Sequence, residues 1–195
     1  MTANAFGPGG DSVEGTSGND LLDGGPGADT LAGGAGYDIY FVDNVDDVVV
    51  ELDNQGYDTI RVNLAAGSTY TVPAHIEDAR LSGHNAVNLL VGADNTGCTL
   101  TGNDAANLLT GGSAGDYLRG GGGADTLDGA GGFDIVGGLD NVGDYTIVQG
   151  EDGAFLLTSV FSGATITARN IESFQFSDAT YLAADLATMI GVQLS

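Results

Sequence analysis

The chain has 195 residues, of which 34 are glycine, 27 are aspartate or glutamate and 4 are lysine or arginine, so its formal net charge is −23. Glycine at about 17%, against ~7% in average proteins, excludes a helical bundle, and the 42% of hydrophobic residues excludes a disordered low-complexity chain. A surface this acidic repels nucleic acids and anionic lipids, so a cation is the expected partner.

The length suits one domain or slightly more. The longest apolar stretches, such as residues 48–50 and 155–157, are far shorter than the ~18 residues that a membrane-spanning helix needs. The opening MTANAFGPGG has neither a basic region nor an apolar run, so no cleavable signal peptide is expected there. The single cysteine, Cys98, is expected to be a buried small residue rather than a reactive thiol.

Five blocks of nine residues begin the chain and cover residues 6–50: FGPGGDSVE, GTSGNDLLD, GGPGADTLA, GGAGYDIYF and VDNVDDVVV. The sixth residue of each block is aspartate, and the eighth is apolar or tyrosine. A glycine-rich tight turn followed by a very short alternating strand predicts half a coil of a flattened solenoid, with about 18 residues in a full coil. The eighth positions, Val13, Leu22, Leu31, Tyr40 and Val49, are the expected core.

The period loosens in the middle of the chain. Residues 56–64, 70–72, 79–83, 83–91 and 93–101 keep an apolar residue near the eighth position. The sixth positions of the last two segments are interpreted as Asn88 and Cys98. We therefore expect ion-poor middle coils at about residues 51–101, held together by apolar and asparagine packing.

Four further blocks cover residues 102–137: GNDAANLLT, GGSAGDYLR, GGGGADTLD and GAGGFDIVG. Their sixth positions are Asn107, Asp116, Asp125 and Asp134, and their eighth positions are Leu109, Leu118, Leu127 and Val136. In both arrays, sixth-position residues that lie two blocks apart are expected to stack along the same edge of the solenoid.

The pattern changes after Gly138. Residues 144–149, 154–160 and 164–168 are typical of strands, with turns at 151–153 and 162–163. Leu182, Leu186 and Ile190 have helical spacing within residues 181–190. Because a solenoid end exposes unpaired strand edges, residues 138–195 are expected to form a β-rich cap on a solenoid of residues 1–137.

The stacked aspartates require a counter-ion. Two carboxylates about 5 Å apart repel by roughly 3 kcal/mol at an effective dielectric near 20, and several such pairs would cancel a typical folding free energy. Carbonyl oxygens of the glycine turns are expected at the same edge, and calcium prefers many flexible oxygen ligands. Magnesium requires a stricter octahedron, and zinc prefers nitrogen and sulfur, whereas His75 and His84 lie outside the arrays.

The predicted calcium ligands are the sixth-position side chains and the turn glycines. The side chains are Asp11, Asp20, Asp29, Asp38, Asp47, Asn107, Asp116, Asp125 and Asp134. The glycines are Gly18, Gly24, Gly25, Gly27, Gly33, Gly34, Gly36, Gly111, Gly112, Gly120, Gly121, Gly123, Gly129 and Gly131. A merely solvated acidic face would not require a period of nine with glycine before each aspartate and an apolar residue after it.

Three blocks, GGPGADTLA, GGAGYDIYF and GGGGADTLD, match the pattern glycine-glycine-any-glycine-any-aspartate-any-apolar-any at every defined position. The chain therefore resembles the RTX, or hemolysin-type, calcium-binding repeat proteins. Residues 42–63 and 170–180 also resemble the connectors and the closing segment of such proteins. Blocks 6–14 and 42–50 lack the leading glycines, so the pair Asp20 and Asp38 fits the pattern better than pairs that use Asp11 or Asp47.

The resemblance implies an all-β fold, a parallel β-roll or right-handed β-solenoid, with calcium ions in the turns. It also implies export from a bacterial cell by the type I secretion machinery, with an uncleaved signal in the C-terminal region, residues 138–195. We expect a secreted, extracellular calcium-binding module that folds on binding calcium outside the cell and has a structural or adhesive role.

The alternative is a polysaccharide-binding or stabilising accessory module of a larger secreted enzyme of the epimerase, protease or lipase type. The four basic residues, Arg61, Arg80, Arg119 and Arg169, are few for a polyuronate ligand, although calcium can bridge two anions. Ice binding would need regular outward rows of threonine and asparagine, and only Thr16 with Asn19 fits in the first array. The sequence has no nucleophile elbow, HExxH motif or phosphate loop, so catalysis is not expected.

Overall fold

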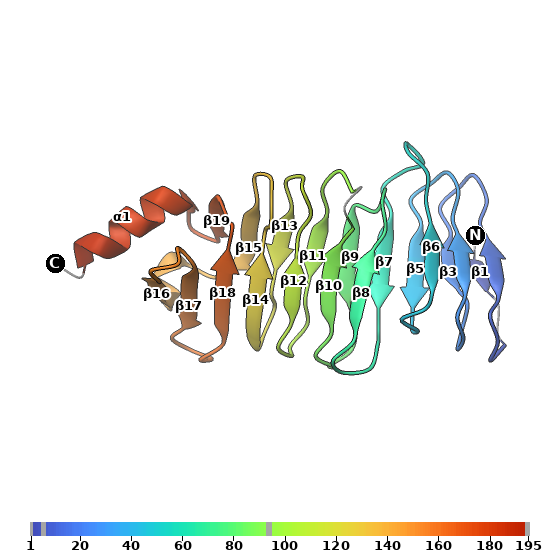
Figure 1. Ribbon diagram of the computed structural model, residues 1–195, viewed down its shortest axis with the longest axis horizontal. Helices are drawn as coiled ribbons and strands as arrows, with labels where there is room; N and C mark the ends of the chain where they lie inside the picture. Colours follow the sequence, from blue (N-terminus) through green and yellow to red (C-terminus); the bar gives the residue numbers. More distant parts are fainter. Residues whose placement is uncertain (1, 5–6, 93–94, 194–195) are drawn as a thin grey trace.

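The computed structural model describes the backbone of residues 2–4, 7–92 and 95–193. The chain forms an elongated, nearly all-β parallel solenoid of about six turns with about 19 residues per turn, followed by a C-terminal helix (Figure 1). The predicted fold class is therefore confirmed. In the part of the chain that the structure describes, no helix has the length and apolar character needed to cross a membrane.

One face of the solenoid is a continuous sheet. Apart from the antiparallel pair β19–β20, its neighbouring strands are parallel. In spatial order, the described strands are β1 (Thr2–Asn4), β3 (Leu21–Asp23), β5 (Ile39–Val42), β7 (Thr59–Val62), β9 (Asp78–Leu81), β11 (Thr99–Thr101), β13 (Tyr117–Arg119), β15 (Ile135–Leu139), β19 (Ser173–Phe176) and β20 (Thr180–Leu182).

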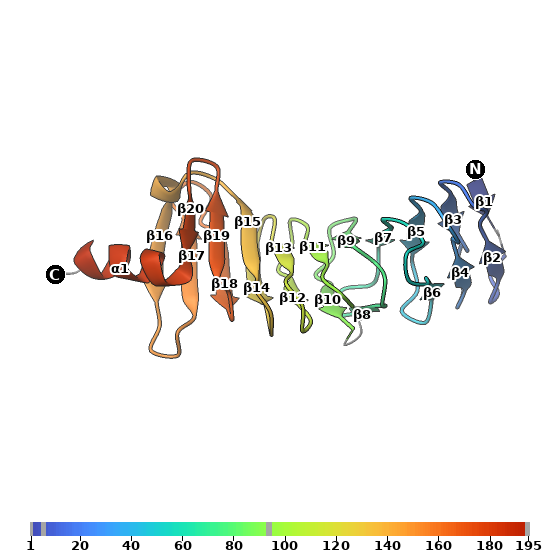
Figure 2. The same cartoon turned by 90° about the horizontal axis from the view of Figure 1, so that it is seen from above.

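The opposite face is divided into two sheets. The first contains β2 (Ser12–Glu14), β4 (Thr30–Ala32) and β6 (Val48–Val50). The second contains, in spatial order, β8 (Thr69–Val72), β10 (Asn88–Val91), β12 (Leu108–Thr110), β14 (Ala124–Asp128), β18 (Thr165–Arg169), β17 (Phe155–Ser159) and β16 (Tyr145–Gln149). Strands β6 and β8 lie apart along the solenoid (Figure 2), and we call this interruption the seam.

Coil length is 18 residues in the arrays and greater in the middle. Leu22 pairs with Tyr40, and Leu109 pairs with Leu127, each 18 residues on, as predicted. Ile60 pairs with Tyr40 across 20 residues. The additional residues lie in the turns, so each eighth-position side chain still enters the core. All nine predicted eighth-position core residues are buried.

The interpretation of residues 83–91 was wrong by one position. Leu89 pairs with the eighth-position residue Leu109, so Val87 rather than Asn88 occupies the sixth position. Leu89 is 0% exposed, whereas its neighbour Leu90 is 39% exposed. A one-residue slip would move every side chain of the strand to the other face, so burial of Leu89 fixes the register.

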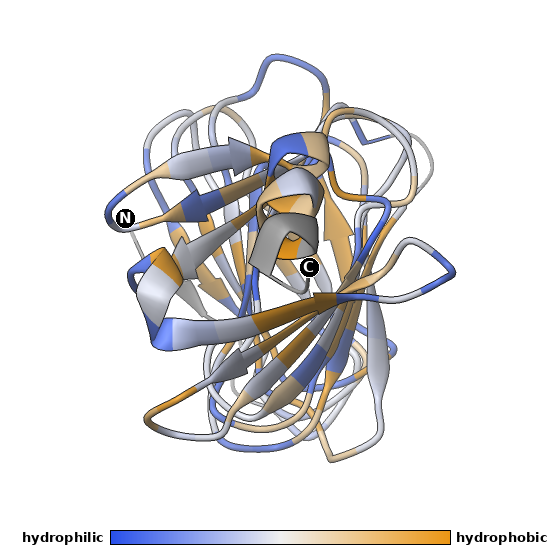
Figure 3. Ribbon diagram, turned by 90° about the vertical axis from the view of Figure 1, so that its left-hand side faces the viewer, coloured by the Kyte–Doolittle hydropathy of each residue, from blue (hydrophilic) through white to orange (hydrophobic). Residues whose placement is uncertain are grey.

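The C-terminal segment closes the solenoid. Strands β16, β17 and β18 form an antiparallel meander, and β18 pairs in parallel with β14 of the last coil, which confirms the three predicted strands. A 3-10 turn, η1 (Val142–Asp144), precedes β16. Helix α1 (Ala183–Gln193) lies in front of the end of the solenoid when the molecule is viewed from its C-terminal end (Figure 3).

The helix begins later than its spacing predicted. Leu182 belongs to β20, pairs with Ser173 and is exposed, so it is not part of the apolar side of the helix. Leu186 is fully buried, and Ile190 packs against the core. The rings of Phe155 and Phe174, whose centroids are 5.0 Å apart, join the two sheets beneath this end.

Candidate metal sites

The sixth-position residues form a hydrogen-bonded ladder along each edge of the solenoid. The backbone N–H of Asp20 donates to Oδ1 of Asp38 at 2.7 Å, 18 residues on. The same contact joins Asp11 to Asp29 at 2.7 Å, Asp29 to Asp47 at 3.0 Å, Asn107 to Asp125 at 2.9 Å and Asp116 to Asp134 at 2.7 Å. The predicted stacking of these residues on neighbouring coils is confirmed. We call this arrangement the sixth-position ladder.

The ladder is buried, in contrast to an ordinary acidic surface. Of the nine sixth-position side chains in the arrays, eight are buried, and Asp11 is half-buried. Burial in a low-dielectric environment raises the pKa of Asp125 and of Asp134 to about 6, because desolvation penalises the charged carboxylate. Desolvation also raises the pKa of Asp116 and of Asp38. A solvated acidic face is therefore excluded for these residues.

The first glycine of a block makes room for the carboxylate of the same block. A Cβ atom on Gly24 would lie 2.2 Å from Oδ2 of Asp29. A Cβ on Gly120 would lie 2.4 Å from Oδ2 of Asp125. Gly33, Gly111 and Gly129 have the same relationship to Asp38, Asp116 and Asp134. The carboxylate thus folds back against the backbone of its own turn.

The remaining predicted glycines differ in how closely their surroundings constrain them. Gly34, at a second position, has a φ of 86°, where a side chain would be strained, and Gly25 and Gly121 resemble it. At fourth positions, a Cβ on Gly27 would lie 2.0 Å from the carbonyl oxygen of Gly9, and Gly36 and Gly123 also stack closely on the preceding coil. Surroundings are looser at Gly18, Gly112 and Gly131.

Several buried carboxylate oxygens in the ladder have no hydrogen-bond partner. These atoms are Oδ2 of Asp29, Asp38 and Asp125. The four arginines are engaged elsewhere: Arg61 lies over Phe41, Arg80 pairs with Asp78, Arg119 lies over Tyr117, and Arg169 is near Asp152. An unpartnered buried charge is costly, and a bound cation would offset that cost.

The available donors fit calcium. The ladder offers carboxylate and amide oxygens beside turns rich in carbonyl groups, and calcium takes 6–8 such oxygen ligands. Both histidines lie at other places: His84 contacts Asp104, and Nδ1 of His75 is 4.0 Å from a carboxylate oxygen of Asp53. Cys98 is buried at a sixth position, and desolvation raises the pKa of its thiol, so the thiolate that a metal would require is disfavoured.

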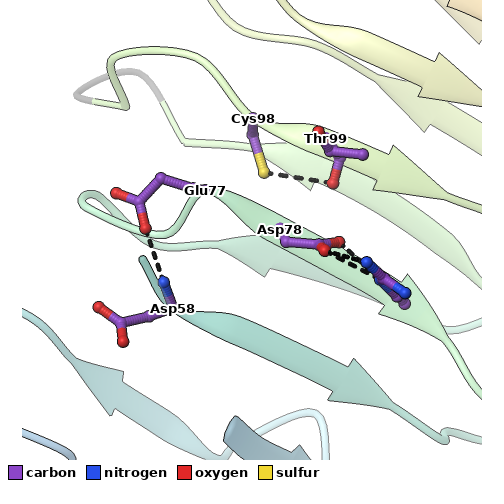
Figure 4. A network of polar contacts seen from close by, with 6 residues as sticks. Asp58, Glu77, Asp78, Cys98 and Thr99 are labelled. Carbon is purple, nitrogen blue, oxygen red and sulfur yellow. Dashed lines mark hydrogen bonds and ion pairs between the residues drawn. The ribbon is translucent and has the colours of Figure 1, made fainter. Parts of the chain in front are cut away.

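The ladder extends to three residues that are absent from the predicted ligand set, Asp58, Glu77 and Glu172. Asp38 N–H donates to Oδ1 of Asp58 at 2.7 Å, and Asp58 N–H donates to Oε2 of Glu77 at 2.8 Å (Figure 4). At the cap, Asp134 N–H donates to Oε2 of Glu172 at 2.8 Å. One signal was present: Gly-Tyr-Asp at residues 56–58 repeats Gly-Tyr-Asp at residues 36–38.

Comparison with known families agrees with this geometry. The family model of the RTX calcium-binding nonapeptide repeat matches four copies in the chain, at residues 7–40 and 101–136. No curated protein matches the chain. The protein is thus a parallel β-solenoid of the class built from calcium-binding repeats. More narrowly, it carries RTX calcium-binding nonapeptide repeats of the hemolysin type, as the sequence pattern predicted.

Proposed function

We propose that the protein is a non-enzymatic, secreted RTX module that folds when calcium binds to the sixth-position ladder outside the cell, and that its role there is structural or adhesive. The observation that carries this proposal is the set of buried carboxylate oxygens without partners at Asp29, Asp38 and Asp125. The ligands would be the predicted sixth-position side chains together with carbonyl oxygens of the glycine turns.

The physical basis is linkage between metal binding and folding. Without a cation, folding must bury carboxylates of like charge close together, which costs free energy. Calcium that binds the folded chain more tightly than the unfolded chain shifts the equilibrium toward the solenoid. In the low calcium of the cytosol the chain would remain open and competent for type I export, and it would fold in the higher calcium outside.

Far-UV circular dichroism of the full chain tests this function. In excess EDTA we expect a largely unfolded spectrum, and addition of millimolar calcium should produce the β-sheet spectrum. Addition of magnesium at the same concentration is the matched control and should have little effect. A complete β-sheet spectrum in excess EDTA would contradict the proposed coupling.

A polysaccharide-binding accessory role is the second candidate, and one observation favours it. Tyr37, Tyr57 and Phe133 each directly precede a carboxylate of the ladder, and all three are exposed. A groove beside the first two rings is lined by Tyr37, Asp38, Ile39, Tyr57 and Thr59. Flat exposed aromatic rings can pack against sugar rings, and neighbouring calcium ions could bridge to uronate groups.

A pull-down on alginate beads in calcium distinguishes the two candidates. Binding that is lost in the double variant Tyr37→Ala/Tyr57→Ala, while Tyr181→Ala still binds, would support the accessory role. Absence of alginate binding by the calcium-loaded wild-type chain would count against polyuronate as the ligand and favour the structural role.

A further inference from the structure

Glu51 occupies a position that glycine holds one and two coils earlier, at Gly33 and Gly15. Ala32 pairs with Val50, so Glu51, which directly follows β6, stands one coil on from Gly33. The Cβ atom that Gly33 lacks would lie 2.2 Å from Oη of Tyr40 and 2.3 Å from Oδ2 of Asp38. In the next coil this crowded corner therefore receives a carboxylate in place of a glycine.

The turn that follows Glu51 makes space for its side chain. Asp38 and Asp58 are 20 residues apart, whereas sixth-position residues in the arrays are 18 apart. The two extra residues lie in the turn between β6 and β7, at the seam. Leu52 and Asp53, which follow Glu51, point outward, and Glu51 itself is buried.

Three carboxylates meet at this corner. One oxygen each from Asp38, Glu51 and Asp58 lies within 4.8 Å of the other two, and the three side chains are 1%, 7% and 1% exposed. Oxygens on opposite sides of one calcium ion, at ~2.3–2.6 Å each, are about 4.6–5.2 Å apart. The three oxygens can therefore coordinate a single calcium ion.

Two carboxylate oxygens of this cluster have no hydrogen-bond partner, and a third accepts a hydrogen bond from a tyrosine. Oδ2 of Asp38 and Oε2 of Glu51 are buried without a hydrogen-bond partner. Tyr40 Oη donates to Oε1 of Glu51, and the Gly33 N–H donates to Oη of Tyr40 at 2.8 Å. The hydroxyl thus orients the glutamate and leaves its second oxygen available.

The charges around the cluster are also negative. Glu77 accepts the Asp58 N–H from the next coil, and it carries a further carboxylate. Arg61, on β7, lies over the ring of Phe41, and Arg80, on β9, pairs with Asp78. Neither arginine compensates the cluster, so three adjacent buried carboxylates remain without a cationic partner among these neighbours.

We propose that Asp38, Glu51 and Asp58 form a separate site for a hard divalent cation, with calcium as the best fit, at the seam of the solenoid. Glu51 and Asp58 lie outside the residues matched by the RTX repeat model. The ion joins the turn after β6 to the residues that directly precede β5 and β7, at the place where the second face of the solenoid is interrupted.

Counting bound ions in Glu51→Gln tests the site. Glutamine keeps the size of the side chain and an oxygen for Tyr40, but it removes the charge. By isothermal titration calorimetry and equilibrium dialysis with calcium alone, the variant should bind one ion fewer per chain than the wild type. Asp53→Asn is the matched control, because Asp53 lies two residues from Glu51 and its side chain is exposed. This variant should bind the same number of ions as the wild type.

A second set of variants separates this site from the repeats. Asp58→Asn should lose the same ion, so the double variant Glu51→Gln/Asp58→Asn should lose no more than either single variant. Combining Glu51→Gln with Asp125→Asn should lose two. Unchanged ion number and affinity in Glu51→Gln would overturn the proposed site and leave the proposed function intact, whereas a wild-type chain that binds no calcium would overturn both.

Terbium luminescence provides a readout that does not depend on ion counting. The chain has seven tyrosines and no tryptophan, so sensitised emission reports tyrosines close to a bound Tb³⁺ ion. Tyr40→Phe should lower this emission, and Tyr181→Phe, in the cap, should not. Equal emission from both variants, with circular dichroism showing both folded, would argue against an ion beside Tyr40.

Discussion

The backbone N–H of Asp116 donates a hydrogen bond of 2.7 Å to Oδ1 of Asp134, one coil further along the solenoid. One carboxylate therefore has two tasks, because it accepts a backbone hydrogen bond and it supplies a predicted metal ligand. Asn107 places an amide at the same position of the ladder, where its Oδ1 accepts the N–H of Asn103 in its own turn and its Nδ2 donates to the carbonyl of Val87 on the preceding coil.

Asp134→Asn should separate these tasks. The amide oxygen can still accept the Asp116 N–H, so the calcium-loaded fold should be retained. The loss of a charged ligand should weaken calcium binding by tenfold or more, which is about 1.4 kcal/mol. Calorimetric titration measures the effect, with the exposed Asp140→Asn as a control that should leave affinity unchanged. Equal affinities in the two variants would show that Asp134 is not a ligand.

Gly120→Ala should be strongly destabilising. The new Cβ would lie 2.4 Å from Oδ2 of Asp125, so either the carboxylate or the turn must move. Overpacking of this kind costs ~1–3 kcal/mol, and calcium affinity should fall with it. Gly18→Ala is the control, because its nearest neighbour would be 3.9 Å away. Urea unfolding in saturating calcium compares them, and similar losses in both variants would refute the steric explanation.

Ala130→Gly should stabilise the protein. Ala130 replaces a second-position glycine and has a φ of 65°, a left-handed conformation that costs a residue with a Cβ roughly 1–2 kcal/mol. The side chain is exposed, so little packing is lost on its removal. Ala114→Gly, at a position without a positive φ, should instead be neutral or destabilising. The contrast is measured by thermal unfolding, and a loss of stability in Ala130→Gly would contradict it.

Acid should stabilise the metal-free fold. Desolvation raises the pKa of Glu51 from 4.5 to about 7, so between these values the folded chain holds a proton that the unfolded chain has released. Stability without metal should therefore decline as pH rises from about 4.5 through 7, because the unfolded state then binds fewer protons than the folded state.

The same protonation should oppose metal binding. Protons compete with calcium for Glu51, and for Asp125 and Asp134, whose pKa values are raised to about 6. Calcium affinity should therefore fall as pH is lowered from 8 to 5. The folded fraction in EDTA, measured by far-UV circular dichroism, and calorimetry in calcium, each across this range, measure the two opposite slopes. Glu51→Gln should flatten the metal-free slope, and an unchanged slope would exclude Glu51 as its source.

The sequence was sufficient to predict the repeated part of the fold. A period of nine with glycine, aspartate and an apolar residue at fixed positions determines both the core row and the stacking of residues such as Asp20 and Asp38. Both follow from the strict spacing of 18 residues, and both are confirmed. The boundaries of the ion-poor middle coils and the full ligand set stay predictions.

Departures from the period were harder to interpret. Asp58 and Glu51 act at a turn lengthened by two residues, so counting by nine does not place them on the ladder. Glu77 and Glu172 join it from segments without a repeat. The prediction placed Asn88 at a sixth position, but Val87 occupies it. The register of this strand is set by the length of the preceding turn and by the burial of Leu89, not by a fixed count of nine residues.

The interruption between β6 and β8 has a mechanical consequence. In the part of the chain that the structure describes, β6 does not pair with β8 on the second face, whereas on the first face β5 pairs with β7 and β7 pairs with β9. The solenoid should therefore resist bending least at this point. The two repeat arrays can tilt relative to each other, with the continuous first sheet acting as the hinge. A long solenoid anchored at one end would yield there first under lateral load.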